Sequence, residues 1–373
     1  MRILISTEVF PPQLGDAVAY VPAVAQALAG RGHQVRVVTP VSDKSATALD
    51  QRYPFQVERL DLGRFWHWRV RLFLQLRWAE VVFVNGLLAE VSALNRLLRR
   101  PTVGRVTTDS VWEYVVDQGW TRDDCATFQR RRYHRAIERF RRWRNQTLRR
   151  MQALLVPCQS LGALVRSWGV SPERVRVLPD AFIPSAEAAV PWPGPDTPLR
   201  LITLGRLSAW QGVDELLAVL IAWDDVGLLV VGDGPQRAAL EQLARRLRLE
   251  QRVRFVGWPE RATWLGWMRG ADLCVLNARH PGTPPGLLDA WAVGVPVLAA
   301  ASGGVVERIR DGINGRLVPL GDRAALRDAL RALLDDPLAR ASLRAGGLLS
   351  ARQEAAFDTM IERLVGLLEE VAR

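Results

Sequence analysis

Apolar runs and turn-forming residues alternate from the start of the chain. Residues 2–7 form a short apolar run that predicts a strand, and residues 11–16 (PPQLGD) are rich in turn formers. Residues 18–29 carry apolar side chains at helical spacing, and residues 34–39 form a second β-branched run. This strand–helix–strand order predicts parallel strands joined by a right-handed crossover.

Further buried strands are predicted in both halves, with helices such as residues 236–247 between them. The candidate strands are residues 81–84, 102–107, 154–157, 175–178, 199–204, 227–231, 253–256, 273–276 and 295–299. The most apolar stretch, residues 286–304, contains Asp289, Gly294 and Pro296, so it predicts a short helix and a buried strand rather than a membrane span. Residues 324–372 predict helix, with breaks near Asp336–Pro337 and Gly346–Gly347.

Pro and Ala without periodicity characterise residues 184–198, which indicates a linker. We therefore expect an N-terminal Rossmann-like domain over residues 1–183 and a second one over residues 199–355. Residues 356–373 are expected to form a helix that packs back on the N-terminal domain. The fold class is α/β, with two doubly wound domains that face a central cleft, where ligands bind beyond the carboxyl ends of the strands.

The charge balance is strongly basic, at +11 over 373 residues, and Lys44 is the single lysine. Such a surplus indicates phosphate-bearing partners. Cys125, Cys158 and Cys274 lie far apart and show no metal-ligand spacing, so we expect reduced, structural cysteines and no metal site. The chain begins without the long apolar core of a signal peptide, which favours a cytoplasmic location.

Several strand ends carry candidate chemistry. Arg206 follows a predicted strand within Gly205–Leu207 and offers a fork for a diphosphate, although a strand-end turn with a solvated Arg is the alternative. Gly232 and Gly234 form a tight turn that brings amides near a base or phosphate, or merely reverses the chain.

The segment 282–290 predicts an anion-receptive helix start, because a proline precedes the free amides of Gly286 and Leu287. Asp289 lies one turn further on. It either accepts hydrogen bonds from sugar hydroxyls or complements the positive helix start. The loop 302–304 is a further place where a ligand can approach the backbone closely.

These loops occur in order at successive strand ends, and from residue 199 to about 337 the chain resembles the donor-binding domain of glycosyltransferase family 4, a retaining family with the GT-B fold. The matching stretches are GRLSAWQG, VVGDGP, VRFVGW, GADLCVLNAR, LLDAWAVGVPVLA and SGGVVERIRDGINGRLV. The N-terminal half is similar too, through FPPQLGD and RGHQVRVVT. The stretch TTDSVWEYVVDQGWTRDD resembles one branch of the family.

The resemblance implies donor contacts at several positions. Gly15 matches the loop glycine that lies against the donor diphosphate, while Asp16 stands where the family usually has a second glycine. Arg206 matches the diphosphate-binding Arg. Its usual Lys partner is replaced by Gln211, which can hydrogen-bond phosphate but does not neutralise it. Trp258 falls in the base-binding loop.

The Glu-x7-Glu motif of the family falls on Pro281 and Asp289. Asp289 matches the Glu that binds the ribose, and Gly286 and Leu287 match the phosphate-receiving amides. Pro281 cannot do the work of the first Glu at the sugar, and the adjacent His280 is the candidate to replace it.

The branch pattern Asp-x-x-Trp-Glu fits Asp109, Trp112 and Glu113. The resemblance implies that Asp109 is the acidic residue of the cleft, so that Asp109, Arg206 and His280 are the catalytic candidates. Trp112 and Glu113 are assigned to the acceptor side.

Two Arg-rich stretches remain. Residues 64–78 (RFWHWRVRLFLQLRW) combine tryptophan and arginine as interfacial membrane helices do, although a helix packed on the sheet with snorkelling arginines is the favoured alternative. Residues 129–150 predict a second Arg-dense helix that suits an anionic lipid surface or a polyanion, or that is simply a solvated face. No nucleic-acid-binding module is recognisable, so nucleic acid is not an expected partner.

The expected function is retaining transfer of a sugar from a UDP-, GDP- or ADP-sugar to a glycan or lipid-linked acceptor, by a cytoplasmic enzyme at the inner membrane face. No cofactor or metal is expected, because cations and amides can stabilise the leaving diphosphate. The alternative is a catalytically impaired relative that binds sugar nucleotide, glycan or a partner as a regulator or scaffold, since Gln211 and Pro281 depart from the motifs. A basic polyanion-binding protein is a third hypothesis.

Overall fold

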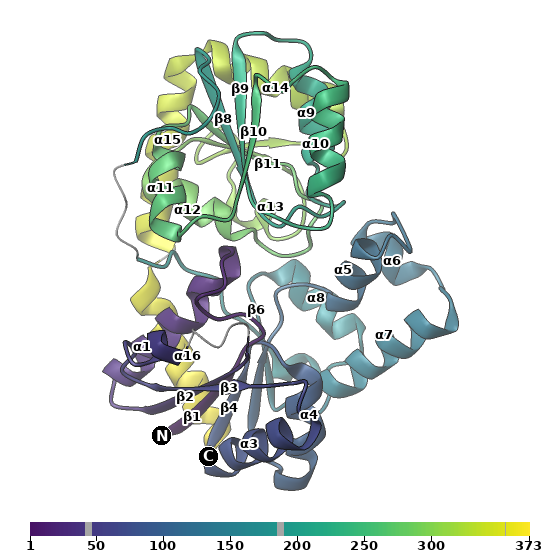
Figure 1. The fold of residues 1–373 in the computed structure, drawn as a ribbon, viewed down its shortest axis with the longest axis vertical. Coiled ribbons are helices and arrows are strands. Elements are labelled where there is room, and N and C mark those ends of the chain that lie inside the picture. Colours follow the sequence, from purple (N-terminus) through teal and green to yellow (C-terminus); the bar gives the residue numbers. More distant parts are fainter. Residues whose placement is uncertain (42–46, 185–189, 355) are drawn as a thin grey trace. The chain divides into compact units, whose positions relative to one another are not determined.

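The computed structural model describes residues 1–41, 47–184, 190–354 and 356–373. The chain divides into two compact units (Figure 1). The first unit comprises residues 1–107, 134–179 and 357–373, and the second comprises residues 108–133 and 180–356. The domain limits drawn from the sequence stay a prediction, and the linker predicted over residues 184–198 lies partly outside the described residues.

The first unit contains a parallel sheet of seven strands in the order β3-β2-β1-β4-β5-β6-β7. Short, nearly continuous apolar runs form these strands because both faces of the sheet are covered by helices. Their bounds are β1 Arg2–Ser6, β2 Gln34–Pro40, β3 Gln56–Leu60, β4 Val81–Val84, β5 Thr102–Arg105, β6 Ala153–Val156 and β7 Val175–Val177.

One face of this sheet is covered by α3, α4, α7 and α8, whose apolar side chains share a core with Leu4, Val82 and Leu154. On the opposite side, α1 packs against β2 and α16, and α16 contacts β4 and β5 (Figure 1). The bounds are η1 Asp16–Ala19, α1 Tyr20–Gly30, α2 Thr47–Asp50, α3 Phe65–Trp78, α4 Leu88–Leu98, α7 Arg135–Leu148, α8 Gln159–Ser167, η3 Pro172–Arg174 and α16 Phe357–Ala372.

The second unit contains a parallel sheet of six strands in the order β10-β9-β8-β11-β12-β13. This order is that of the doubly wound Rossmann fold, and it reverses between β8 and β11. The bounds are β8 Leu199–Leu204, β9 Val226–Val231, β10 Val253–Gly257, β11 Leu273–Leu276, β12 Val297–Ala300 and β13 Arg316–Val318.

Helices cover both faces of this second sheet (Figure 1). One core joins α9, α10 and α14 to the sheet, a second joins α11 and α12 to it, and α15 packs against α12 and α14. The bounds are α5 Ser110–Asp117, α6 Cys125–Arg130, α9 Val213–Leu220, α10 Arg237–Arg246, α11 Arg261–Arg269, α12 Pro285–Val293, α13 Val305–Arg308, α14 Arg323–Asp335 and α15 Pro337–Glu354. None of the helices in the described parts of the chain is long and apolar enough to cross a membrane.

Two sequence-based expectations about helices are wrong. The segment 129–150 is not one helix: α6 ends at Arg130, and α7 begins at Arg135 after His134, whose ring accepts from the amide of Ala136. The break expected near Gly346–Gly347 is absent, because α15 runs through it. A Cβ on Gly346 would lie 2.0 Å from the carbonyl oxygen of Ile313, so this glycine permits close packing of the helix.

Two strands were not predicted, namely β3 and β13. Both are edge strands. Because an edge strand is incompletely buried, its run of apolar residues is short and predicts a strand only weakly. The break expected at Asp336–Pro337 is confirmed, and Asp336 accepts from the first amides of α15.

Candidate active site

Two loops of the second unit follow the strands at which the strand order reverses. The loop after β8 carries Arg206 and Ser208, and the loop after β11 carries His280. In doubly wound sheets, ligands bind outside the carboxyl ends of the strands at this switch point. The topology therefore selects these two loops as the candidate site within the unit.

Glycines allow the loop after β8 to lie directly on the loop after β9. A Cβ on Gly232, whose φ is +143°, would lie 2.0 Å from the carbonyl oxygen of Gly205. The amide of Leu207 donates to the carbonyl of Asp233 at 3.0 Å, and a Cβ on Gly234 would meet the backbone of Leu207. This packing accounts for Gly232 and Gly234, and a direct contact of either with the donor stays a prediction.

Arg206 is held by a carboxylate from α5. Its Nε and Nη2 atoms donate to Oδ2 of Asp117 at 3.2 and 3.0 Å. The hydroxyl of Ser208 donates to Oδ1 of the same carboxylate at 2.7 Å. The Arg206 side chain nevertheless remains 59% exposed, so part of its guanidinium is available to a ligand.

His280 is oriented by two hydrogen bonds. The amide of Gly282 donates to Nδ1 at 3.0 Å, so Nδ1 is the acceptor nitrogen, and Nε2 donates to Oε1 of Glu113 at 3.2 Å. Glu113 lies on α5 one turn before Asp117. One face of α5 therefore contacts the loops after both β8 and β11.

Aromatic rings join these groups. The ring of Trp210 lies 6.1 Å from that of Trp112 and 5.1 Å from that of His280, measured between centroids. Trp112 is buried, and its Nε1 donates to the carbonyl of Asp123 at 3.0 Å. The structure thus brings the predicted residues Trp112, Glu113, Arg206 and His280 into one cluster.

Asp109 caps the helix that carries this cluster. Its Oδ1 accepts from the amides of Val111 and Trp112 at 3.0 and 3.2 Å, and its Oδ2 accepts from Gln129 at 2.9 Å. The side chain is fully buried. These contacts make Asp109 the N-cap of α5, which begins at Ser110, and this is a structural role. A catalytic role of Asp109 stays a prediction.

Gln211 is turned toward the protein backbone. Its side chain is buried, and Nε2 donates to the carbonyl of Leu204 at 3.0 Å. The same nitrogen would lie 2.5 Å from a Cβ on Gly205. In this conformation, Gln211 braces the end of β8, and the donor contact implied by the family resemblance remains a prediction.

Asp289 forms a buried ion pair with Arg261. Nη1 of Arg261 donates to Oδ2 at 2.8 Å and Nη2 donates to Oδ1 at 2.5 Å, while the Asp289 side chain is 3% exposed. Burial raises the pKa of the Asp289 carboxyl above its ordinary value, and Arg261 opposes that rise. Each carboxylate oxygen thus accepts from the Arg261 guanidinium, and the contact of Asp289 with the ribose stays a prediction.

The start of α12 packs tightly on the sheet. A Cβ on Gly286 would lie 2.9 Å from the side chain of Leu204, and the amide of Leu287 donates to the carbonyl of Pro284 at 3.1 Å. Trp258, in the loop after β10, meets Trp264 edge-on at 5.5 Å between ring centroids. Phosphate and base contacts at these positions stay predictions.

Gly15 belongs to the first unit and follows β1 there. Its φ is +148°, and its carbonyl accepts from the amide of Val18 at 3.4 Å where η1 leads into α1. The side chain of Asp16 lies outside what the structure describes.

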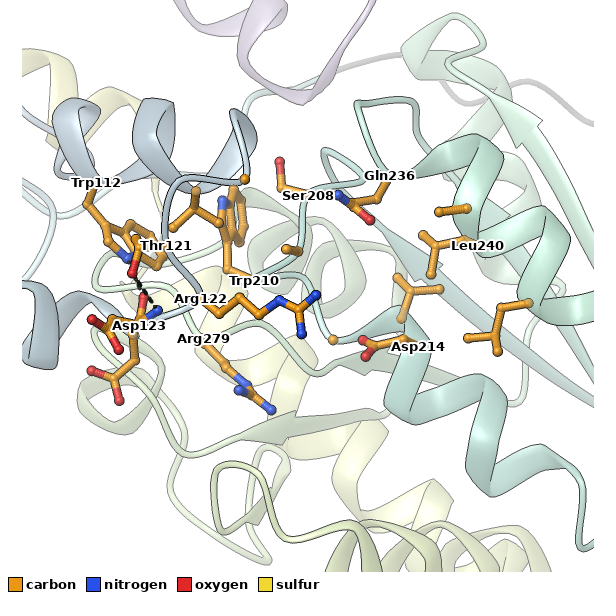
Figure 2. A pocket seen from close by; sticks show the side chains of 18 of the residues that line it. Trp112, Thr121, Arg122, Asp123, Ser208, Trp210, Asp214, Gln236, Leu240 and Arg279 are labelled. Atoms are coloured by element: carbon orange, nitrogen blue, oxygen red, sulfur yellow. Dashed lines mark hydrogen bonds between the residues drawn. The ribbon is translucent and has the colours of Figure 1, made fainter.

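A cavity of about 520 Å³ opens beside the cluster, within the second unit. Figure 2 shows the guanidinium groups of Arg122 and Arg279 projecting into it, with Trp210 and Asp214 on its wall. Sequence reasoning missed this cavity, and it also missed Asp117 and Ser208. Its lining residues are Trp112, Val116, Gly119, Thr121, Arg122, Asp123, Asp124, Ser208, Ala209, Trp210, Gly212, Val213, Asp214, Gln236, Ala239, Leu240, Leu243, Arg246 and Arg279.

The cavity mixes apolar and charged walls. Arg279 pairs with Glu215 on α9, whereas the described structure gives Arg122 and Asp214 no ion pair. Hydrogen-bonding groups over an apolar floor suit a polar organic ligand of moderate size. Within the described parts of the chain, no group of three or more His, Cys, Asp or Glu side chains could hold a metal ion.

Two sequence profiles match the chain. The one described as Glycosyltransferase Family 4 matches residues 17–182, and the one described as Glycosyl transferases group 1 matches residues 198–336. Together they leave out residues 1–16, 183–197 and 337–373. The second match contains the loops of Arg206 and His280.

Similar proteins with known activities are transferases. A phosphatidyl-myo-inositol mannosyltransferase of Mycobacterium leprae is 27% identical over 96% of this chain and 94% of its own length. A GDP-mannose-dependent monoacylated alpha-(1-6)-phosphatidylinositol monomannoside mannosyltransferase of Corynebacterium glutamicum is 33% identical over 48% of this chain and 49% of its own. These relatives support the transferase prediction rather than the catalytically impaired alternative.

Solved structures share the architecture. Sucrose-phosphate synthase from Thermosynechococcus elongatus superposes with a TM-score of 0.76 at 20% identity and covers 100% of this chain and 99% of its own. The Anabaena protein HepE, solved with UDP-glucose, gives 0.77 at 18% identity and covers 99% and 100%. At such identities the likeness shows the fold.

Two parallel α/β sheets with these neighbours define the GT-B fold, and the sequence profiles and relatives make the chain a glycosyltransferase. The chain belongs to glycosyltransferase family 4.

Proposed function

We propose that this enzyme transfers a sugar from a nucleoside-diphosphate sugar to a glycan or lipid-linked acceptor, with retention of the anomeric configuration. The proposal rests on two side chains at the switch point of the second sheet. Arg206 is more than half exposed, and His280 is held in one orientation by hydrogen bonds. A cationic fork at such a place suits a diphosphate.

In the proposed reaction, Arg206 neutralises charge on the diphosphate as it leaves the sugar. His280 lies at the other loop, where its Nε2–H holds the Glu113 carboxylate, and the remaining lone pairs of that carboxylate accept from sugar hydroxyls. Helix α12 and its first amides are assigned to the phosphate side by the family resemblance. The base of the donor is assigned to the loop of Trp258.

The acceptor is assigned to the cavity beside Trp112 and Trp210. Its volume of about 520 Å³ accommodates a saccharide. Asp214 and Gln236 offer hydrogen bonds to hydroxyl groups, and Arg122 offers a charge to an anionic substituent (Figure 2).

We further propose that the enzyme works at an anionic membrane surface through α3. The side chains of Trp68, Leu72 and Leu76 are buried in the core of the first unit. Trp66, Val70 and Leu74 lie at intervals of four residues and are 75%, 56% and 53% exposed. Because α3 is apolar on two faces, packing on the sheet explains only one of them.

Basic residues surround this second apolar face, which we name the α3 ridge (Trp66, Val70 and Leu74). Arg64, Arg71 and Arg77 lie on or beside the helix and are exposed. An exposed apolar stripe among cations is typical of helices that lie at the surface of an anionic bilayer. Such a surface would place the enzyme beside a lipid-linked acceptor.

The test of the transferase proposal is calorimetry of the purified protein with UDP-, GDP- and ADP-sugars, followed by a transfer assay with the sugar that binds. We expect micromolar to millimolar affinity for one nucleotide, and affinity that is weaker by ~10-fold or more in Arg206→Ala. Arg316→Ala is the control, since Arg316 is likewise about half exposed and pairs with an aspartate, Asp311, but lies away from the switch-point loops.

Binding that is unchanged in Arg206→Ala would remove Arg206 from the donor site. A folded protein that binds none of the nucleotides would favour the catalytically impaired alternative. Binding without transfer to glycan or lipid-linked acceptors would favour a regulator or scaffold that recognises sugar nucleotides.

A further inference from the structure

Asp117 occupies an unfavourable position for a carboxylate. It is the last residue of α5, where the partial negative charge of the helix end repels an anion. Its side chain is only 13% exposed, so solvent does not fully compensate the charge. The stability of α5 alone therefore gives no reason for an aspartate here.

The contacts of Asp117 supply that reason. One carboxylate oxygen accepts from Nε and Nη2 of Arg206, and the other accepts from the hydroxyl of Ser208. Arg206 and Ser208 belong to the same loop after β8, so a single carboxylate fixes the conformation of both side chains. The charge at the end of α5 is balanced by the guanidinium.

The geometry leaves one side of Arg206 unused. A guanidinium carries five N–H groups in a planar fork, and Asp117 takes those on the Nε–Nη2 edge. The side chain is more than half exposed, which leaves Nη1 and the outer hydrogen of Nη2 for a ligand. Two parallel N–H groups on that edge suit two oxygens of a diphosphate.

We propose that Asp117 is a positioning residue for the donor diphosphate, which holds Arg206 so that its free edge meets the phosphate oxygens. This inference rests on the proposed function. A fixed guanidinium loses less conformational freedom on binding than a mobile one, so the pre-set orientation strengthens diphosphate binding. The same helix carries Glu113 to His280, so α5 orients the polar groups of both loops.

The test is a double-mutant cycle with Asp117→Ala, Arg206→Ala and the double variant. Affinity is measured by calorimetry for the sugar nucleotide that binds and for inorganic pyrophosphate. We expect Asp117→Ala to weaken both by ~10-fold or more, the loss typical of a hydrogen bond to a charged group. The double variant should bind no more weakly than Arg206→Ala.

Rescue separates positioning from a general structural role. Asp117→Asn keeps an oxygen that accepts from Ser208 or Arg206, so it should restore a large part of the affinity lost in Asp117→Ala. The control is Asp328→Ala, which removes the same charge from an exposed pair with Arg327 on α14 and should leave affinity unchanged.

Unchanged or tighter binding in Asp117→Ala would overturn the inference, as would effects that add in the double variant. If the unmodified protein binds pyrophosphate but no sugar nucleotide, the proposed function fails, and the cycle with pyrophosphate still decides the role of Asp117. If it binds neither, both proposals fail.

Discussion

His280 donates from Nε2 to the carboxylate of Glu113 at 3.2 Å, while its Nδ1 accepts from the backbone at 3.0 Å. The imidazole is thus held in one tautomer by groups on two different segments. Glu113 comes from α5, a helix that precedes β8 by more than eighty residues in the chain. The Glu113–His280 contact therefore joins α5, which carries the Asp-x-x-Trp-Glu pattern, to the loop after β11. In that loop, Pro281 stands where the Glu-x7-Glu motif has its first Glu.

We expect His280→Ala to lower kcat by roughly 10²-fold, as the loss of one preorganised polar group does at a transition state. Glu113→Gln should lose less, because the Gln oxygen still accepts from Nε2. Steady-state kinetics with the preferred donor measures both. His134→Ala removes an exposed histidine that caps α7 and is the control. Equal rates for the two His variants would exclude His280 from the reaction.

Arg261→Ala should strongly destabilise the protein. It leaves the buried Asp289 carboxylate without its guanidinium, and breaking a buried pair from one side costs about 3–5 kcal/mol. Arg316→Ala breaks an exposed Arg–Asp pair and should change the unfolding free energy by less than ~1 kcal/mol. Urea unfolding of the two variants gives the comparison, and similar midpoints would mean that the Arg261–Asp289 pair is not buried in solution.

Two glycine variants test the packing of the C-terminal helices. Alanine is the better helix former by about 1 kcal/mol, so Gly366→Ala in α16, where a Cβ meets nothing within 4 Å, should stabilise the protein. Gly346→Ala in α15 should destabilise it, because the Cβ would lie 2.0 Å from the carbonyl oxygen of Ile313. Thermal unfolding of each variant shows whether its stability rises or falls. Stabilisation by both variants would contradict the close approach at Gly346.

The glycines of α15 show where sequence reasoning reaches its limit. Consecutive glycines ordinarily weaken a helix, so the sequence predicted a break at Gly346–Gly347. The helix persists because these glycines let it pack closely on Ile313 and Trp291, which are distant in sequence. The main strands, by contrast, were predictable because their apolar runs are short, continuous and local.

The residues of the candidate site could be predicted from the sequence, but most of the contacts between them could not. Arg206 and the glycine turns follow strands directly, so local pattern and family resemblance locate them. The contacts of Asp117 with Arg206 and of Arg261 with Asp289 join segments far apart in the chain, and no spacing rule foresees them. Only the i, i+4 spacing of Glu113 and Asp117 on α5 offered a local signal that two carboxylates share one helix face.

Transfer should proceed without a divalent metal ion. Arg206 and backbone amides are assigned to the charge that develops on the leaving diphosphate, which is the work a metal performs in other transferases. We expect the transfer rate in excess EDTA to equal that without chelator. Loss of activity in EDTA that Mg²⁺ or Mn²⁺ restores would contradict this assignment and would call for a search for its ligands.

The α3 ridge should govern binding to anionic vesicles. Flotation with vesicles of neutral and of one-third anionic phospholipid is the assay, and we expect the unmodified protein to float with the anionic ones alone. Serine at Trp66, Val70 and Leu74 should abolish flotation, because it removes the apolar face and leaves every arginine in place. High salt should weaken flotation, since attraction of the arginines to the surface is screened.

A second triple variant makes this test specific. Val306, Ile313 and Leu338 are exposed apolar residues of the second unit, and serine at these positions removes a comparable apolar area from another surface. This control should float as the unmodified protein does. Equal flotation of both triple variants would mean that the arginines alone hold the protein to lipid. An unmodified protein that stays in solution with the anionic vesicles would overturn the membrane proposal.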